Sequence, residues 1–348
     1  MTTQAATVPS APAPDDPAEV RPPVSLGRRV QRVLHAQPIL GPAMVLAAAL
    51  VVFSLWNPDR FFASGTFVLI LQQTAPIAVL AIGQTIIILT AGIDLSVGAI
   101  MVLSMITMAK VNAEQGVPGP LALLIGFLVG VACGLVNGLL VTRLKLPPFI
   151  VTLGTFSIFF AINLLYSKSA TVRGTDMSSV MLFLGQGVSV AGTKISYGSI
   201  LMLLLFAVMA YVLRNTPWGR HVYAVGDDVE AARLSGIRVR RVLLSVYVVA
   251  GLLCAVAAWV LIGRVGSASP QSGQTENLAS ITAVVLGGTS LFGGRGLVLG
   301  TLLGALVVTT FSVGLGIAGV DQQWQLLATG VLVIGAVTLD QWIRRVKL

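Results

Sequence analysis

A short acidic segment in the second half of the chain has the composition of a protein docking element. Asp227 and Asp228 precede Glu230, which gives an acidic relative of the capping box that begins a helix. Gly236 supplies the usual helix stop. A helix of about two turns is marginal alone in water, so we expect it to be stabilised against another protein. An ordinary surface loop is the alternative.

The same predicted helix presents small side chains on one side. By helical spacing, Asp228, Ala231, Ala232 and Ser235 fall on a common face. Such a face is shallow. We therefore expect it to fit into a groove of a partner protein, where added bulk would prevent docking.

Asp94 stands alone as an acidic residue in a long apolar stretch. The neighbouring acidic residues are Asp59 and Glu114, and a carboxylate near the centre of a bilayer would cost a few kcal/mol. At the start of an apolar run, Asp can accept the N–H groups that lack partners at a helix N-terminus. We expect this capping role for Asp94, with a direct role in gating as the alternative.

Motifs for nucleotide, metal or covalent chemistry are incomplete. Residues 288–295 resemble a phosphate loop, but Gly294 stands where the lysine belongs. Cys133 and Cys254 lie inside apolar runs, and the two histidines are far apart in the sequence. The sequence therefore predicts no catalytic residues, no cofactor and no metal.

The composition indicates which elements must hold these residues. Hydrophobic residues make up 55% of the 348 residues and charged residues only 10%, with a mean hydropathy of +0.91. A soluble domain of this size could not cover its surface with so few charges, so we predict a membrane protein. The net charge of +9 then reflects membrane topology, and no nucleic acid partner is expected.

Ten apolar segments without Asp, Glu, Lys or Arg can be read as membrane helices, which need about 20 residues each. They are residues 39–56, 61–93, 95–109, 115–142, 146–167, 195–213, 242–263, 277–294, 296–320 and 322–339. Only Asp94 separates the second segment from the third. An eleventh uncharged run, residues 177–193, has too short an apolar core. We reject it as a span.

The basic residues support this count, because Lys and Arg in short loops favour the cytoplasmic side. With ten spans and a cytoplasmic N-terminus, 16 of the 22 Lys and Arg residues lie inside. We therefore predict an all-α polytopic membrane protein with both termini cytoplasmic. It would comprise a disordered tail over residues 1–37, a membrane domain over 38–342 with a cytoplasmic loop at 214–241, and a tail over 343–348.

Polar side chains suggest where a solute would pass. Asn137 is one of several uncharged polar residues within the spans, and such residues suit a neutral hydroxylated solute better than a proton relay. Residues 270–277 form a polar segment on the outer side, where Gln274 and Glu276 could hydrogen-bond a sugar or a delivering protein. A packing role for Asn137, and an interface loop without solute contact at 270–277, are the alternatives.

Glycines form two further patterns. A glycine recurs every four residues from Gly126 to Gly138, which predicts close packing between helices. The spacing Gly, two residues, Leu, two residues, Gly occurs at residues 92–98 and again at 294–300. This spacing indicates short or broken helices and is consistent with a duplicated unit of several helices.

Three longer segments resemble the permease subunits of bacterial ABC importers for monosaccharides, the ribose, xylose and fructose group. They are residues 91–101 (AGIDLSVGAIM), 219–237 (GRHVYAVGDDVEAARLSGI) and 269–296 (SPQSGQTENLASITAVVLGGTSLFGGRG). The resemblance covers roughly residues 60–340. The acidic pair at 227–228, with residues 144–155 (LKLPPFIVTLGT), is most similar to the fructose type.

This resemblance implies residue roles. In the family, the segment that matches residues 226–237 contacts the ATPase. The resemblance therefore implies an ATPase-coupling role for Gly226, Asp227, Asp228, Glu230, Ala231, Ala232, Leu234, Ser235 and Gly236.

The resemblance also implies partners and a location. We expect a cytoplasmic ABC ATPase subunit, an extracytoplasmic sugar-binding protein and a second permease copy that completes a dimer. The chain would lie in the bacterial inner membrane and would not itself be an enzyme. A stand-alone ion-coupled carrier or channel for a small polar solute is the alternative, and the scarcity of buried carboxylates disfavours proton coupling.

Overall fold

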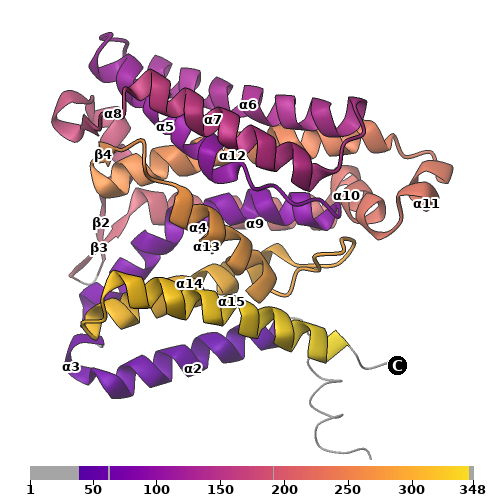
Figure 1. Cartoon of the computed structure of the whole chain (residues 1–348). Coiled ribbons are helices and arrows are strands. Elements are labelled where there is room, and N and C mark those ends of the chain that lie inside the picture. Colours follow the sequence, from indigo (N-terminus) through magenta and orange to yellow (C-terminus); the bar gives the residue numbers. More distant parts are fainter. Residues whose placement is uncertain (1–38, 62, 191, 345–348) are drawn as a thin grey trace, which may run out of the picture.

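A computed structural model describes residues 39–344 except 62 and 191, and it shows a bundle of long helices (Figure 1). Six helices of this part are long and apolar enough to cross a membrane, and three more are apolar but shorter. The chain is therefore a polytopic helical membrane protein. The predicted tail over residues 1–37 lies outside the described residues, as do residues 345–348 of the predicted C-terminal tail.

The long helices overlap the ten segments that were predicted as spans. They are α2 (Leu40–Trp56), α4 (Ser64–Leu89), α5 (Val97–Ala113), α6 (Gly119–Arg143), α7 (Pro148–Ser167), α9 (Tyr197–Asn215), α12 (Val239–Val265), α13 (Gln274–Leu286), α14 (Val298–Ile317) and α15 (Gln322–Arg344). How many of them cross the membrane stays a prediction.

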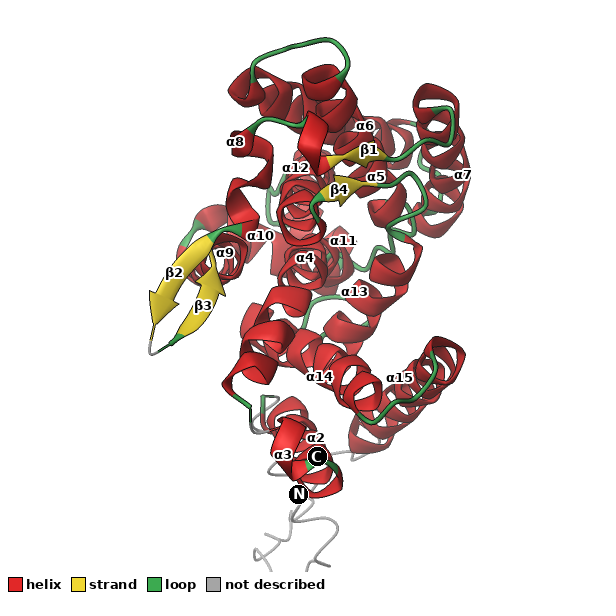
Figure 2. Cartoon of the chain, turned by 90° about the vertical axis from the view of Figure 1, so that its left-hand side faces the viewer, coloured by secondary structure: helices red, strands yellow, loops and turns green. Residues whose placement is uncertain are grey.

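Short elements lie at the two ends of the bundle (Figures 1 and 2). At one end are α3 (Pro58–Phe61), α8 (Ser179–Leu182) and two antiparallel ribbons, β1 (Val172–Arg173) with β4 (Ser267–Ala268) and β2 (Gly187–Val190) with β3 (Thr193–Ser196). At the other end are α10 (Pro217–Asp227) and α11 (Val229–Leu234). The rejected run at 177–193 forms α8, the 3-10 turn Phe183–Gly185 and most of the β2–β3 ribbon, and another 3-10 turn, Gly174–Asp176, lies just before it. Its rejection as a span is therefore confirmed.

Two helices form the centre of the bundle. Helix α12 packs against α4, α5 and α6, and α4 also packs against α13 and α14. Within its most apolar stretch, 67% of α12 is buried, compared with 28% of α7. Helix α7 instead exposes large apolar side chains such as Phe149, Ile150 and Leu165, as expected for a surface that faces lipid.

Glycines bring α6 and α12 into close contact, as the four-residue spacing predicted. A Cβ atom added at Gly130 would overlap the carbonyl oxygen of Gly251, and one added at Gly134 would overlap that of Tyr247. The reciprocal contact also holds, because a Cβ at Gly251 would overlap the Gly130 carbonyl. Such backbone contact supplies packing where the hydrophobic effect does not drive association in lipid.

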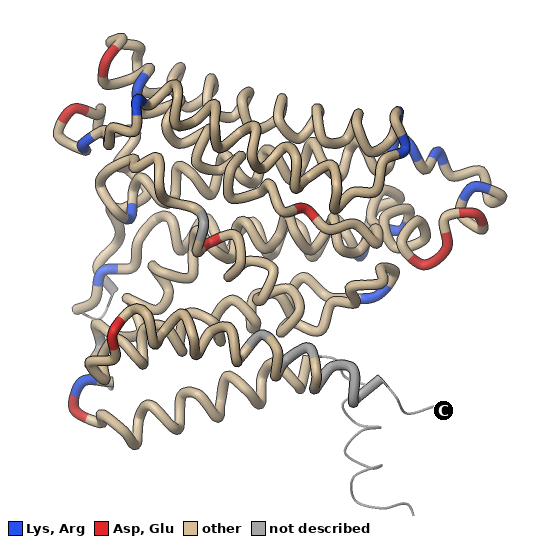
Figure 3. The backbone as a smooth tube through the Cα atoms, in the orientation of Figure 1, with Lys and Arg blue, Asp and Glu red and all other residues tan. Residues whose placement is uncertain are grey.

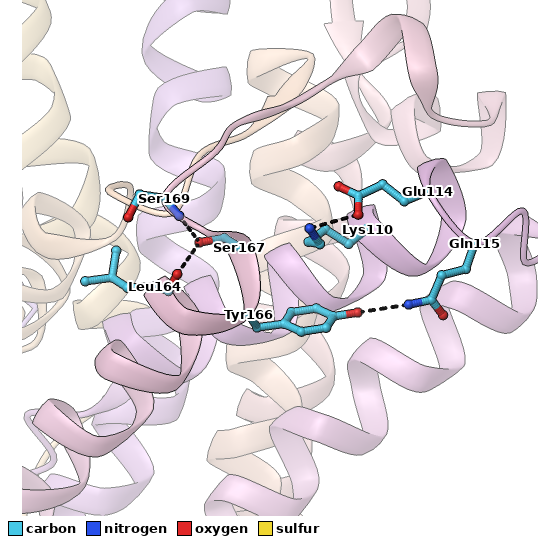
Figure 4. Close-up of polar contacts among 7 residues, drawn as sticks. All are labelled: Lys110, Glu114, Gln115, Leu164, Tyr166, Ser167 and Ser169. Atoms are coloured by element: carbon cyan, nitrogen blue, oxygen red, sulfur yellow. Dashed lines mark hydrogen bonds and ion pairs between the residues drawn. The ribbon is translucent and has the colours of Figure 1, made fainter.

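Charged residues gather mainly at the two ends of the bundle (Figure 3). At the end that carries the ribbons, Lys110 on α5 pairs with Glu114 at 2.8 Å, and its ammonium lies 5.5 Å from the centre of the Tyr166 ring on α7. The Tyr166 hydroxyl accepts a hydrogen bond from Gln115 at 3.4 Å (Figure 4). Polar and aromatic contacts of this kind are typical of helix ends at a membrane–water interface.

The glycine contact generates a stability prediction. Replacing Gly134 with Ala should force α6 and α12 apart and cost about 1–3 kcal/mol, which lowers the midpoint of thermal unfolding of the detergent-purified protein. Gly154→Ala on α7 is the matched control, because a Cβ there meets no atom within 4 Å. Equal midpoints for the two variants would contradict the contact.

Candidate functional site

The predicted docking helix is present and capped by an aspartate. The side chain of Asp228 accepts the N–H groups of Glu230 at 2.8 Å and Ala231 at 3.0 Å. The cap is one residue later than the spacing to Glu230 suggested, because Asp227 is the last residue of α10. Gly236 has a φ of +82° and follows the helix, so the predicted stop is confirmed.

The exposed side of α11 differs from the predicted one. Ala231 and Ser235 are exposed, but Ala232 is only 4% exposed and therefore turns toward the chain's own bundle. The four predicted residues therefore do not share one exposed face, and the ATPase-coupling role of Ala232 stays a prediction. The large apolar side chains that α11 exposes are Val229 at 47% and Leu234 at 87%.

Three glycines lie where α10 meets the end of α4 and the loop between α13 and α14. We call Gly226, Gly293 and Gly294 the glycine junction. Gly294 N–H donates to the carbonyl oxygen of Leu89 at the end of α4, at 3.0 Å. A Cβ added at Gly226 would overlap that same carbonyl, and one at Gly293 would lie 2.6 Å from the Gly226 oxygen. Gly293 and Gly294 also have positive φ values, 84° and 68°, which favour glycine.

A tyrosine strengthens this junction from α10. The Tyr223 hydroxyl donates to the carbonyl oxygen of Gly296 at 2.8 Å. Burial raises the pKa of Tyr223 above its ordinary value, so the hydroxyl keeps the proton that it donates. Helix α10 is thus bonded to the segment that precedes α14.

Side chains from three helices hold the backbone between α4 and α5. Gln84 on α4 donates to the carbonyl oxygen of Asp94 at 2.5 Å, and Asn277 on α13 donates to that of Leu95 at 2.8 Å. Thr152 on α7 accepts the Leu95 N–H at 3.1 Å. An unpaired backbone group in lipid costs several kcal/mol, so these bonds make the interruption possible.

The Asp94 carboxylate lies in the same buried cluster. It is 1% exposed, and its Oδ1 atom accepts from the N–H of Ser96 at 2.7 Å and from the Ser96 hydroxyl at 2.6 Å. Asn137 on α6 donates to the Ser96 hydroxyl oxygen at 2.8 Å and lies 3.5 Å from Asp94 Oδ2. The structure therefore brings Asp94 and Asn137 together, although the sequence placed them on separate segments.

The expected cap of α5 takes a different form. Helix α5 begins at Val97, and no side chain caps its N-terminus. Asp94 bonds instead to Ser96, the residue directly before the helix, and residues 92–96 between the two helices are not helical. Its role in a gate stays a prediction.

The polar segment at 270–277 is anchored at both ends. Asn163 on α7 donates to the carbonyl oxygen of Pro270 at 2.8 Å, and Glu276 accepts the N–H of Gly273 at 3.0 Å, which caps α13. Glu276 also lines a cavity, and neither Asp94 nor Asn137 is among the residues that line it. The backbone of Gln274 begins α13, while its side chain lies outside the described part.

Several of these contacts escaped the sequence reasoning. Thr152, Asn277 and Tyr223 were not singled out, although each is a single polar group within or beside an apolar helix. In the described part of the chain no group of three His, Cys, Asp or Glu residues could hold a metal ion.

Comparisons with known proteins agree with a transport role. Residues 66–337 match the family described as "Branched-chain amino acid transport system / permease component". The chain is 50% identical to the fructose import permease protein FrcC of Rhizobium meliloti, over 92% of this chain and 90% of that protein. It is 40% identical to the ribose import permease protein RbsC of Bacillus subtilis, over 87% of this chain and 92% of that protein.

A third relative extends the range of solutes. The chain is 34% identical to the D-allose transport system permease protein AlsC of Escherichia coli K12, over 88% of this chain and 92% of that protein. No solved structure matches the chain.

The interrupted segment generates a prediction about stability. Replacing Thr152 with Val should leave the Leu95 N–H and the Ile93 carbonyl, which Thr152 also contacts at 3.1 Å, without this partner. The expected loss is about 1–3 kcal/mol, read as a lower unfolding midpoint in detergent. Thr155→Val is the control, because that hydroxyl bonds only within its own helix. If both variants unfold alike, Thr152 does not hold the segment.

Proposed function

The chain belongs to the family of branched-chain amino acid transport system permease components, and from this premise we propose that it is the membrane subunit of an ABC importer for a monosaccharide. The chain is a permease component and not itself an enzyme, and ATP hydrolysis takes place on a separate subunit. The observation that carries the proposal is similarity to sugar permeases over nearly the whole chain, with 50% identity to the fructose relative. A fructose-type sugar is the preferred substrate.

The topology that we propose for this permease has ten membrane spans and places both termini in the cytoplasm. The ten long helices coincide with the segments that place 16 of 22 basic residues inside. In this topology α10 and α11 are cytoplasmic, and the β ribbons are outside. The membrane is the bacterial inner membrane.

The ATPase docks on an apolar patch at the cytoplasmic end. We define the docking patch as Val229, Leu234 and Phe292, which are 47%, 87% and 86% exposed. Phe292 directly precedes the glycine junction, where the 287–297 loop meets the end of α10 that leads into α11. Exposed apolar groups on a water-facing loop are typical of a protein interface.

The glycine junction connects this patch to the helices that surround the solute. A displacement of α11 would move α10 and with it Gly226. Gly226 contacts Leu89 of α4 and Gly294 of the loop before α14. Asp94 lies within the interruption between α4 and α5, and Asn137 and Asn277 hydrogen-bond to the same segment. Closure of the ATPase subunits would therefore shift both interrupted segments together.

Two further partners complete the importer. A sugar-binding protein would deliver solute to the outer end, where β1, β4 and the segment at 270–277 lie. A second permease copy would form the dimer on which two ATPase subunits act. A stand-alone ion-coupled carrier is not favoured, because the relatives are import permeases.

Topology can be tested by thiol labelling from outside the cell. Gln186 and Arg238 are both exposed, at opposite ends of the bundle. In a background without Cys133 and Cys254, Gln186→Cys should react with an impermeant thiol reagent and Arg238→Cys should not. The reverse pattern would overturn the proposed orientation.

Docking can be tested at Leu234, since Ala232 is buried and a bulky residue there would damage the chain's own packing. Leu234→Asp should abolish co-purification of the ATPase and lower uptake at least tenfold, while membrane insertion and the unfolding midpoint stay unchanged. Val188→Asp, which alters an apolar side chain 45% exposed at the other end, is the matched control for ATPase binding. Retention of the ATPase by Leu234→Asp would remove α11 from the interface.

A further inference from the structure

A cavity of about 320 Å³ lies between α4, α12, α13, α14 and α15. Its volume is at the lower end of the range of small-molecule sites, about 300–1,000 Å³. Arg264 in the last turn of α12 and Gln322 at the start of α15 line it. Both positions lie at the helix ends nearest the β ribbons, so the cavity is close to the outer end of the bundle.

Three uncharged polar side chains in the lining make no hydrogen bond within the described part of the chain. They are Gln73 on α4, Ser312 on α14 and Gln322 on α15. This differs from Gln72, the neighbour of Gln73, whose amide donates to the carbonyl oxygen of Lys194 at 3.4 Å. Free amides and hydroxyls that line a cavity within a membrane protein need water or a polar solute as partner.

The charges in the lining are balanced. Arg264 and Glu276 bring one charge of each sign, and Glu276 uses only its Oε2 atom for its two hydrogen bonds, which leaves Oε1 available. Seven of the lining side chains are neutral amides or hydroxyls. This surface favours a neutral solute with many hydroxyl groups over an anion or a cation.

The remaining wall is aliphatic, and none of the described lining side chains is aromatic. A sugar would therefore gain hydrogen bonds without ring stacking. Weak binding of this kind suits a site that must release its solute at every transport cycle, because tight binding would slow release.

We propose that this cavity holds the monosaccharide in transit, after the binding protein has released it and before it passes the Asp94 cluster. Gln73 on α4 and Ser312 on α14 hydrogen-bond the sugar hydroxyls. The inference rests on the proposed function. An amino acid could also use the Arg264 and Glu276 pair, but it has fewer hydroxyls to match the seven neutral groups.

The test uses the reconstituted complex of permease, ATPase and binding protein in proteoliposomes. The Ser312→Cys variant is made in a background without Cys133 and Cys254. It is labelled only after folding and reconstitution, with an impermeant thiol reagent added on the side of the binding protein. Labelling should lower fructose uptake at least fivefold, and fructose turnover should slow the labelling. ATP hydrolysis stimulated by the loaded binding protein should persist, which separates a blocked cavity from failed coupling.

A second pair of variants tests the same site without labelling. Gln73→Leu should lower fructose uptake at least threefold, whereas Gln72→Leu should not, because the two side chains point about 100° apart on the helix. Wild-type uptake by both Gln73→Leu and labelled Ser312→Cys would overturn the cavity site while leaving the proposed function intact. Import of leucine but not fructose by the unmodified complex would overturn both.

Discussion

The whole arrangement depends on one constraint, the pairing of backbone N–H and C=O groups where membrane helices are interrupted. Between Leu89 and Val97 the chain leaves helical geometry, and water is not present in hydrocarbon to satisfy the freed groups. Gln84, Thr152 and Asn277 supply the missing partners from three helices. The positions of α4, α7 and α13 are therefore fixed relative to one short segment.

This constraint explains why the buried polar residues have two roles. The bonds that stabilise the interruption also link helix α13 to the segment beside Asp94. Movement of α13 must then break these bonds or carry the segment with it. The stability of the interrupted segment and the position of α13 consequently depend on the same side chains, and this limits how far either can be altered independently.

Local features could be predicted from the sequence, whereas relations between distant segments could not. The acidic start and the Gly236 stop of α11 depend on residues within one short helix, so the sequence predicted the stop and placed the cap to within one residue. The buried side of α11 was not, because only the placement of α12 turns Ala232 inward. The Leu95 carbonyl meets Asn277 across 182 residues, and no spacing rule in a single sequence indicates such a pair. The cavity likewise needs five helices in place.

The glycine junction has a mechanical consequence. Where helices touch through side chains, rotamer changes can absorb a displacement, so the contact deforms easily. At Gly226, Leu89 and Gly294 the touching atoms belong to the main chain, whose covalent geometry yields little. The junction should thus be stiff, so that a small movement of α10 is passed on with little loss in amplitude. Such a joint tolerates substitutions on the exposed side of α11, but not at the point where the backbones meet.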